Sequence, residues 1–406
     1  METPCVYDMN VLYDAFVAAM KSSPWKEEPQ RFETDFLSNL VALHHELQDR
    51  TYHTLPGSEF ILNERGKIRH VHGGRMRDRV VRHALCDAVL TPALQPYILH
   101  NNFASQTGKG VDAARRAFER DLHNYWLEHR TNEGYVVFLD FSKYYDNIQH
   151  QRAKDMMCEK LDDEDARWLL CEIVDNFAVD VSYMTDEEYA RCMDEKFNSV
   201  AYYETVTPEM KTGEKFMAKS VDIGDQVSQN IGVYFPTRID NFVTNVCGIR
   251  RYGRYMDDLY LIHPDREYLV EIARKITELA REQGLFINEQ KTRIVKLGGT
   301  YVFLKIKYSL TEAGKVIRRL SPSAITRERR RLKAYRRLLD KGQITYATIE
   351  QAYKSWMGRY ARLMSKQQRI NMQTLYQNLF NGRNPRWKPE FIPSSSPTAP
   401  SSSASA

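Results

Sequence analysis

Two aspartates stand side by side between two apolar runs, and this feature constrains the fold more than any other. The stretch RYMDDLYLIH, residues 254–263, places Asp257 and Asp258 at the centre of a hairpin pattern. Adjacent carboxylates about 4 Å apart repel by roughly 1 kcal/mol in water and roughly 4 kcal/mol near a protein surface. Because Asp is favoured in tight turns, the pattern predicts two strands joined by a two-residue Asp-Asp turn.

A third carboxylate ends another predicted strand. In GYVVFLDFSKYYDNI, residues 134–148, a β-branched and aromatic strand ends at Asp140. If the two strands are neighbours, the three carboxylates converge and bind divalent metal, since Mg²⁺ takes one or two carboxylates and shares phosphate oxygens. Two such ions can clamp the attacking and leaving oxygens of phosphoryl transfer. An isolated Asp-Asp hairpin is more often an exposed turn, so the flanking motifs must decide between an exposed turn and a metal site.

The predicted elements alternate between helices and strands. Residues 57–72 predict two strands around an Arg-Gly turn. Apolar residues at helical spacing predict helices over 77–96, 110–130 and 265–283, the last with Asp265 as N-cap and Gly284 at its end. Residues 222–243 are predicted to start as a Gly turn and to become a helix. Residues 178–220 are irregular and charged and predict no definite structure. The order of elements from 134 to 310 predicts an α+β domain whose sheet presents carboxylates from one edge.

Charge is concentrated near the C-terminal end of the chain. The formal net charge of the 406 residues is only +5. Residues 315–341, however, include eleven Lys or Arg, and their only acidic residues are Glu328 and Asp340. This excess of positive charge indicates a polyanionic partner. Six cysteines without C-x-x-C spacing predict reduced thiols and a cytoplasmic protein. No apolar run approaches the ~20 residues that span a bilayer, so no membrane partner is expected.

Two histidines, His70 and His72, lie two residues apart in a predicted strand and therefore face the same side. No cysteine or carboxylate stands beside them at the spacing of metal ligands. We therefore expect no metal site there.

From about residue 57 to 340 the chain resembles a bacterial reverse transcriptase, an RNA-directed DNA polymerase. The resemblance is carried, in order, by RDRVVRHALCDAVLTPAL, GKGVDAARRAFERDL, FLDFSKYYDNI, IGDQVSQ, RYMDD and INEQKTRIV. IGDQVSQ is most similar to enzymes of diversity-generating retroelements, and some phage-defence enzymes are similar. The resemblance implies a right-hand polymerase fold whose antiparallel palm sheet carries the carboxylates. Its expected parts are an N-terminal helical region over 1–56, fingers over 57–133, a palm over 134–310 with an insertion near 178–220, a basic helical thumb over 311–390 and a disordered tail over 391–406.

The resemblance implies roles for the acidic residues and their neighbours. Asp140, Asp257 and Asp258 are the expected catalytic carboxylates. They would hold two Mg²⁺ ions together with the carbonyl of Phe141, and Mn²⁺ is a candidate substitute. Tyr145 matches the bulky side chain that excludes a ribose 2′-OH; a core aromatic is the alternative.

Other residues are expected around the incoming nucleotide. Arg69 matches a residue that holds the triphosphate, because a guanidinium binds two phosphate oxygens. Lys291 matches a lysine near the leaving pyrophosphate, and Ile223 stands where many relatives carry Gln, which predicts lowered fidelity. For the basic residues near Arg69 the alternative is a solvated basic hairpin, and for Lys291 it is a surface lysine of a strand. The full expected nucleotide-binding set is Arg69, Lys67, Arg75, Tyr145, Ile223, Gly224 and Lys291.

The basic segment 326–341 is expected to be a helix that contacts the template–primer duplex. Each phosphate that it neutralises should add about 0.9 to the salt slope of binding. A solvated helix face is the alternative. The residues expected to bind nucleic acid are Arg327, Arg330, Arg331, Lys333 and Arg337.

The predicted function is RNA-directed DNA synthesis by two-metal nucleotidyl transfer in a bacterial retroelement or an antiviral defence system. Template-independent or protein-primed DNA synthesis, and a non-catalytic RNA-binding scaffold, are the alternatives. The expected partners are an RNA template, a DNA or RNA primer and a cognate structured non-coding RNA. An accessory protein is a further candidate.

Overall fold

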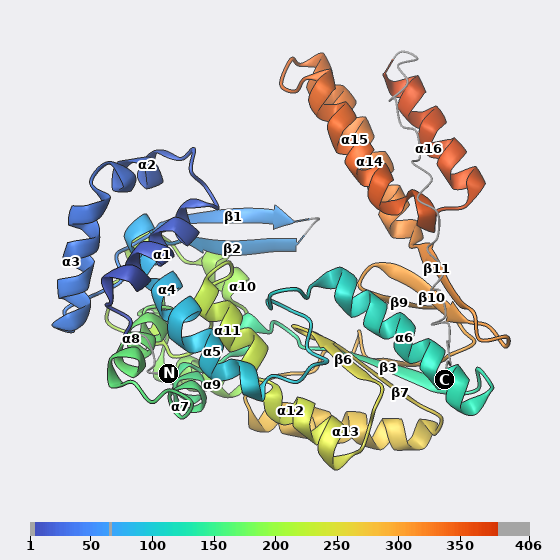
Figure 1. The fold of residues 1–406 in the computed structure, drawn as a ribbon, viewed down its shortest axis with the longest axis horizontal. Coiled ribbons are helices and arrows are strands. Elements are labelled where there is room, and N and C mark those ends of the chain that lie inside the picture. The colour runs from blue at the N-terminus through green and yellow to red at the C-terminus, as the bar shows by residue number, and fades with distance from the viewer. Residues whose placement is uncertain (1–4, 65–66, 381–406) are drawn as a thin grey trace, which may run out of the picture. The chain divides into compact units, whose positions relative to one another are not determined.

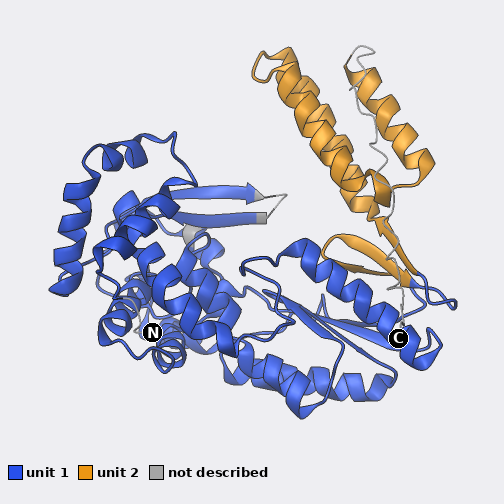
Figure 2. Cartoon of the chain, viewed as in Figure 1, with its two compact units in different colours: residues 1–299, 310–315 blue, residues 300–309, 316–406 orange. Residues whose placement is uncertain are grey.

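The structure is a computed structural model that describes residues 5–64 and 67–380. It contains two compact units, one of residues 1–299 with 310–315 and one of residues 300–309 with 316–406 (Figure 2). Helices and antiparallel strands are mixed, as the α+β prediction requires. No helix among the described residues is long and apolar enough to cross a membrane.

The first unit contains a four-stranded antiparallel sheet, the carboxylate sheet (Figure 1). Its strands, in spatial order, are β6 (Tyr252–Tyr255), β7 (Asp258–His263), β3 (Tyr135–Asp140) and β8 (Arg293–Lys296). Side chains alternate between the two faces of a strand. Phe138 and Tyr260 therefore share one face, where both contact Phe118 of α6 (Val111–His129). The opposite face carries buried leucines of β3 and β7 and packs against α13 (Arg266–Glu282).

Helix α13 forms as predicted from its end signals. Asp265 caps its N-terminus by accepting hydrogen bonds from the amides of Glu267 and Tyr268 at 2.8 and 3.2 Å. Gly284 follows the helix with φ of +75°, a conformation that glycine adopts without strain. The predicted apolar stripe is buried at Leu269, Ile272, Ile276 and Ala280.

The predicted hairpin at 57–72 is confirmed as β1 (Ser58–Glu64) paired with β2 (Lys67–Gly73). The predicted continuous helix over 77–96 is wrong in part. It divides into α4 (Met76–Leu85), a π-helical turn (Cys86–Leu90), α5 (Thr91–Leu94) and a 3₁₀ turn (Gln95–Tyr97). Pro92 lies at the start of α5 and has no N–H to continue the helical hydrogen bonds.

Residues 178–220 form a small folded insert, although their sequence predicts no definite structure. Strands β4 (Val179–Asp180) and β5 (Phe216–Met217) pair antiparallel, and α9 (Asp186–Asp194) begins with a capping box. The insert also contains α10 (Ser199–Thr205) and a 3₁₀ turn (Pro208–Met210). Its own apolar core comprises Val179, Val181, Phe197, Tyr202 and Met217.

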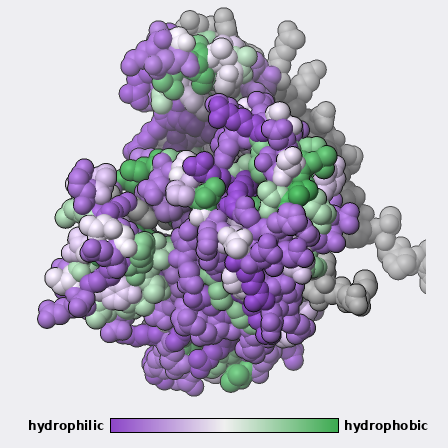
Figure 3. Space-filling view, turned by 90° about the vertical axis from the view of Figure 1, so that its left-hand side faces the viewer, coloured by the Kyte–Doolittle hydropathy of each residue, from purple (hydrophilic) through white to green (hydrophobic). Residues whose placement is uncertain are grey.

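The remaining helices of the first unit surround the sheet and the hairpin. They are α1 (Met9–Met20), α2 (Glu27–Thr34), α3 (Phe36–Gln48), a 3₁₀ turn (Tyr145–Asn147), α7 (His150–Cys158), α8 (Glu164–Asp175), α11 (Gln226–Tyr234), α12 (Thr237–Asn241) and a π-helical turn (Phe242–Val246). A shared core joins α1, α4 and the sheet. On the face that Figure 3 shows, hydrophilic residues predominate and apolar patches are small and separate.

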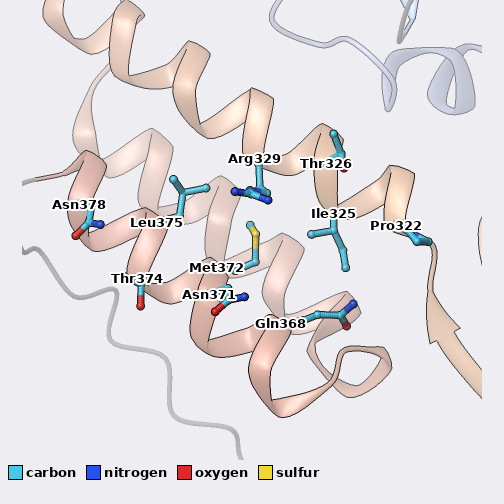
Figure 4. A pocket seen from close by; sticks show the side chains of 10 residues that line it. All are labelled: Pro322, Ile325, Thr326, Arg329, Gln368, Asn371, Met372, Thr374, Leu375 and Asn378. Carbon is cyan, nitrogen blue, oxygen red and sulfur yellow. The ribbon is translucent and has the colours of Figure 1, made fainter.

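In the part of the second unit that the structure describes, a small sheet is combined with three helices. Its antiparallel strands are β11 (Val316–Leu320), β10 (Ile306–Leu310) and β9 (Tyr301–Phe303), and its helices are α14 (Pro322–Asp340), α15 (Tyr346–Tyr360), a 3₁₀ turn (Ala361–Leu363) and α16 (Lys366–Leu379). The predicted basic helix is thus confirmed. A groove of about 500 Å³ lies between α14 and α16, with Arg329, Met372 and Leu375 in its lining (Figure 4). The tail predicted to be disordered lies outside the described residues.

Candidate active site

The carboxylates of β3 and β7 meet because the two strands pair in register. Asp140 is the direct cross-strand partner of Asp258, so both project from the face of the sheet that also carries Tyr260. Asp257 lies in the adjoining turn, and its carbonyl accepts a hydrogen bond from the amide of Phe141 at 3.2 Å. The pairing therefore brings three acidic residues to one end of the carboxylate sheet.

The turn itself differs from the sequence prediction by one residue. Tyr255 pairs with Asp258, so the two turn residues are Met256 and Asp257, and the predicted Asp-Asp turn is wrong. Met256 has φ of +56°, in the left-handed region that non-glycine residues rarely adopt. Such backbone strain costs on the order of 1 kcal/mol and persists only where neighbouring groups hold it.

A buried ion pair supports this turn. The Arg254 side chain is fully buried, and its Nη2 and Nε lie 2.6 and 2.8 Å from the two carboxylate oxygens of Asp240. Nη2 also donates to the carbonyl of Val233 at 2.7 Å, and Nη1 donates to the carbonyl of Met256 at 3.2 Å. Arg254 thus links the strained turn to α12. The sequence does not single out Arg254 or Asp240, because nothing in the local pattern shows that the two residues meet.

Electrostatic repulsion among the carboxylates is strong. Burial, followed by the charges of Asp257 and Asp140, raises the pKa of Asp258 to about 7. Lys291 offsets part of the negative charge, because its Nζ lies 2.6 Å from Asp140 Oδ2. Carboxylate oxygens with excess negative charge are the donor set that Mg²⁺ prefers. These residues therefore fit a divalent cation site.

A cavity of about 810 Å³ opens beside the carboxylates. Of the residues predicted from the sequence, its lining includes Arg69, Asp140, Phe141, Tyr145, Ile223, Gly224, Asp257 and Lys291. Arg75 lies at the N-cap of α4 and donates from Nε to the carbonyl of Pro56 at 2.8 Å, away from this lining. The side chain of Lys67 lies outside the described residues. The structure thus brings together most of the expected nucleotide-binding residues.

Tyr145 forms part of the cavity wall and packs against α11. Its hydroxyl lies 3.9 Å from Sδ of Met256. A Cβ atom added at Gly232 of α11 would come within 2.7 Å of the Tyr145 ring, so this close approach requires glycine. Burial, followed by the charge of Asp257, raises the pKa of the Tyr145 hydroxyl, which stays neutral.

The loop that carries Ile223 and Gly224 is held at its C-terminal end by Asp225. Asp225 caps α11 by accepting from the amide of Val227 at 2.8 Å, and it forms a buried ion pair with Arg82 of α4 at 2.8 Å. Gly224 has φ of +98°, which a side chain would strain. The sequence prediction missed Arg82 and Asp225, because nothing local shows that the two residues meet.

The insert also reaches the cavity. Val200 and Glu204 of α10 belong to its lining. They were missed because residues 178–220 predict no definite structure. The insert therefore contributes both an apolar and an acidic side chain to the site.

The basic residues of α14 divide into two groups. Arg327, Arg330, Lys333 and Arg337 are exposed. Arg331 is only half-buried, and its Nη2 lies 2.8 Å from the buried carboxylate of Glu328. Four of the five predicted nucleic-acid-binding residues are thus accessible to a polyanion, and Arg331 also has a structural partner.

Residues 61–308 match the family model described as reverse transcriptase (RNA-dependent DNA polymerase). This chain belongs to the reverse transcriptase family. The matched range covers more than half of the chain and includes the carboxylate sheet, the cavity and the insert. No curated protein matches the chain at a significant level. Family membership accounts for a carboxylate cluster beside a cavity rich in basic and aromatic residues.

Proposed function

We propose that this reverse transcriptase extends a primer 3′-OH with deoxynucleotides on an RNA template at the carboxylate cluster. The observation that carries the proposal is the position of Asp140 and Asp257 in the lining of one cavity that also contains Arg69, Tyr145 and Lys291. A nucleotidyl transfer needs positioning and charge neutralisation more than a covalent nucleophile. The cavity offers groups for both purposes.

Asp140, Asp257 and Asp258, with the carbonyl of Phe141, would hold two Mg²⁺ ions, and Mn²⁺ is a candidate substitute. The convergence of Asp140, Asp257 and Asp258 supports this assignment: after burial, the charges of Asp257 and Asp140 raise the pKa of Asp258, and a cation would balance these charges. Bound Mg²⁺ would supply electrostatic stabilisation of the reacting phosphate oxygens. Arg254 keeps Asp257 in place through its hydrogen bond to the neighbouring carbonyl.

The other side chains of the cavity would bind and select the nucleotide. Arg69 carries a guanidinium that suits a triphosphate, and the half-exposed Lys291 can reach both Asp140 and the cavity. The Tyr145 ring, fixed against Gly232, would exclude a ribose 2′-OH by its bulk. Ile223 offers no side-chain hydrogen bond beside the templating pair, so we propose low fidelity.

The parts of a right-hand polymerase can be assigned to elements of the fold. We assign the fingers to the β1–β2 hairpin with α4, the palm to the carboxylate sheet and the thumb to α14–α16. The exposed cations Arg327, Arg330, Lys333 and Arg337 support contact of α14 with the template–primer duplex.

The biological setting that we propose is a bacterial retroelement or an antiviral defence system, with a cognate structured RNA and, as a further candidate, an accessory protein. The insert is the part of the chain that we assign to such a partner, because it has its own core and lines the cavity. A variable target gene with a template repeat beside the gene would support the first setting, and neighbouring antiviral genes the second.

Primer extension on an RNA template with deoxynucleotides and Mg²⁺ tests the proposal. Wild type should extend the primer and Asp257→Asn should not. Asp265→Asn is a matched control, because Asn caps a helix as well as Asp and Asp265 lies at the start of α13. Product formed without template would instead favour template-independent synthesis. Equal extension by wild type and Asp257→Asn would overturn the assignment.

A further inference from the structure

A cluster of two histidines and two carboxylates lies on the β1–β2 hairpin, separate from the carboxylate sheet. Glu59 of β1 is the direct cross-strand partner of His72, and His70 stands on the same face of β2. Asp222, from the loop before α11, places its Oδ1 3.1 Å from His72 Nδ1. The sequence predicts no metal site at these histidines, and this prediction is revised here because their acidic neighbours come from another strand and a distant loop.

Glu59, His70 and His72 place their possible ligand atoms close to one another. One atom each from Glu59, His70 and His72 lies within 4.8 Å of the others. His72 Nε2 is 2.9 Å from His70 Nδ1, and Glu59 Oε2 is 3.5 Å from His70 Nε2. Zinc–ligand bonds of about 2.0–2.2 Å in a tetrahedron put neighbouring ligand atoms about 3.3 Å apart. The two distances end on different nitrogens of the His70 ring, and one ion binds only one of them. The His70 ring or the exposed Glu59 side chain must therefore rotate for the three ligands to converge on an ion.

Asp222 orients one of the two rings. Its carboxylate faces Nδ1 of His72, which directs the Nε2 lone pair of the same ring toward His70 and Glu59. Metal-binding histidines usually donate their other ring N–H to a carboxylate in this way, which fixes the tautomer and strengthens the ligand. The arrangement is therefore that of a histidine prepared for a cation.

The local charge and the donor types favour a transition metal. The carboxylates of Glu59 and Asp222 together carry two negative charges. The nearby ammonium of Lys211 interacts with both histidines and offsets one of these two charges. Imidazole nitrogens suit zinc-like ions, whereas Mg²⁺ prefers oxygen donors. Glu59 is 53 % exposed, so a water can take the fourth position.

We propose that Glu59, His70 and His72 bind one divalent transition-metal ion such as Zn²⁺, and that Asp222 holds the His72 ring in position. The ion joins the hairpin to the loop that carries Ile223. Because Arg69 directly precedes His70 and Ile223 directly follows Asp222, the ion fixes two parts of the cavity lining. This site is distinct from the carboxylate cluster, and the proposal does not rest on polymerase activity.

Zinc binding by the full chain in excess Mg²⁺ tests the proposal. After treatment with a chelator and addition of Zn²⁺, wild type should retain one more equivalent of zinc than Glu59→Gln. Co²⁺ should give the visible absorption of an imidazole-bound ion in wild type and not in Glu59→Gln. His70→Gln is a second variant with the same expected loss, and Asp222→Asn should weaken zinc affinity by about 10- to 100-fold.

His83→Gln is the matched control. His83 Nδ1 pairs with Asp87 Oδ2 at 2.9 Å on α4, so it is also an imidazole–carboxylate pair. This variant should bind zinc and Co²⁺ as wild type does. Equal zinc in wild type, Glu59→Gln and His70→Gln would overturn the proposal and leave the cluster as a hydrogen-bonded network. An equal loss in His83→Gln would overturn it as well.

Discussion

Replacement of Arg254 by Met should destabilise the protein more than replacement of any exposed arginine. Arg254 and its partner Asp240 are 0 % and 1 % exposed at their side chains. Removal of one member of a buried ion pair leaves an uncompensated charge and costs about 3–5 kcal/mol. That is a large part of the 5–15 kcal/mol that typical domains possess. We expect a correspondingly lower urea midpoint for the first unit.

A double-mutant cycle separates the charge from the lost packing. Asp240→Asn removes the second charge but keeps an oxygen that can accept from the Tyr252 hydroxyl. The double variant should therefore be more stable than the sum of the single losses predicts, with a coupling energy of about 2–3 kcal/mol.

The exposed pair of Arg238 and Glu282, at 3.0 Å, provides the control. Arg238→Met should change the unfolding free energy by less than about 1 kcal/mol. Equal losses for Arg254→Met and Arg238→Met, or simple additivity in the cycle, would refute the reasoning. At temperatures where Arg254→Met stays folded, primer extension should still fall, because the carbonyl of Met256 has lost its Nη1 donor.

Three further outcomes are expected. Burial raises the pKa of Asp121 from 3.8 to about 6. The folded state therefore binds the Asp121 proton more tightly than the unfolded state, and the stability that this proton contributes is fully present below about pH 4 and is lost as the pH rises through about 6. Asp121→Asn should reduce the fall in unfolding free energy between about pH 4 and pH 7 by up to about 3 kcal/mol, measured by urea titration at several pH values. The same pH profile in the variant and wild type would contradict this role of Asp121. Tyr145→Ala should raise ribonucleotide incorporation at least tenfold in single-nucleotide extension, whereas unchanged selectivity would exclude the steric role. Ile223→Gln should lower the error frequency in sequenced products, and an error spectrum identical to wild type would rule out a role in fidelity.

Elements with a strong local pattern could be predicted from the sequence. The strand that ends at Asp140 and the helix between Asp265 and Gly284 follow from periodicity and end signals, and the structure confirms both. The residues of the turn could not be located to one residue, because cross-strand pairing of Tyr255 and Asp258 decides it. The local pattern therefore predicts the strands, whereas the cross-strand pairing determines which residues form the turn.

Contacts between distant residues could not be predicted. Arg254 meets Asp240 and Arg82 meets Asp225 only because helices and strands pack together. Sequence spacing likewise gives no sign that Glu59 from β1 joins the histidines of β2. The insert was missed for a related reason, since its elements are short and are stabilised by a small core of their own.

The central claim is that Asp140 and Asp257 hold the metal ions at which a nucleotide reacts. The most direct measurement is anomalous diffraction from crystals of the protein with a template–primer duplex, an unreactive deoxynucleotide triphosphate and Mn²⁺. We expect Mn²⁺ peaks at Asp140 and Asp257, with the triphosphate between them and Arg69. Nucleotide bound in the cavity with Mn²⁺ absent from both aspartates would contradict it.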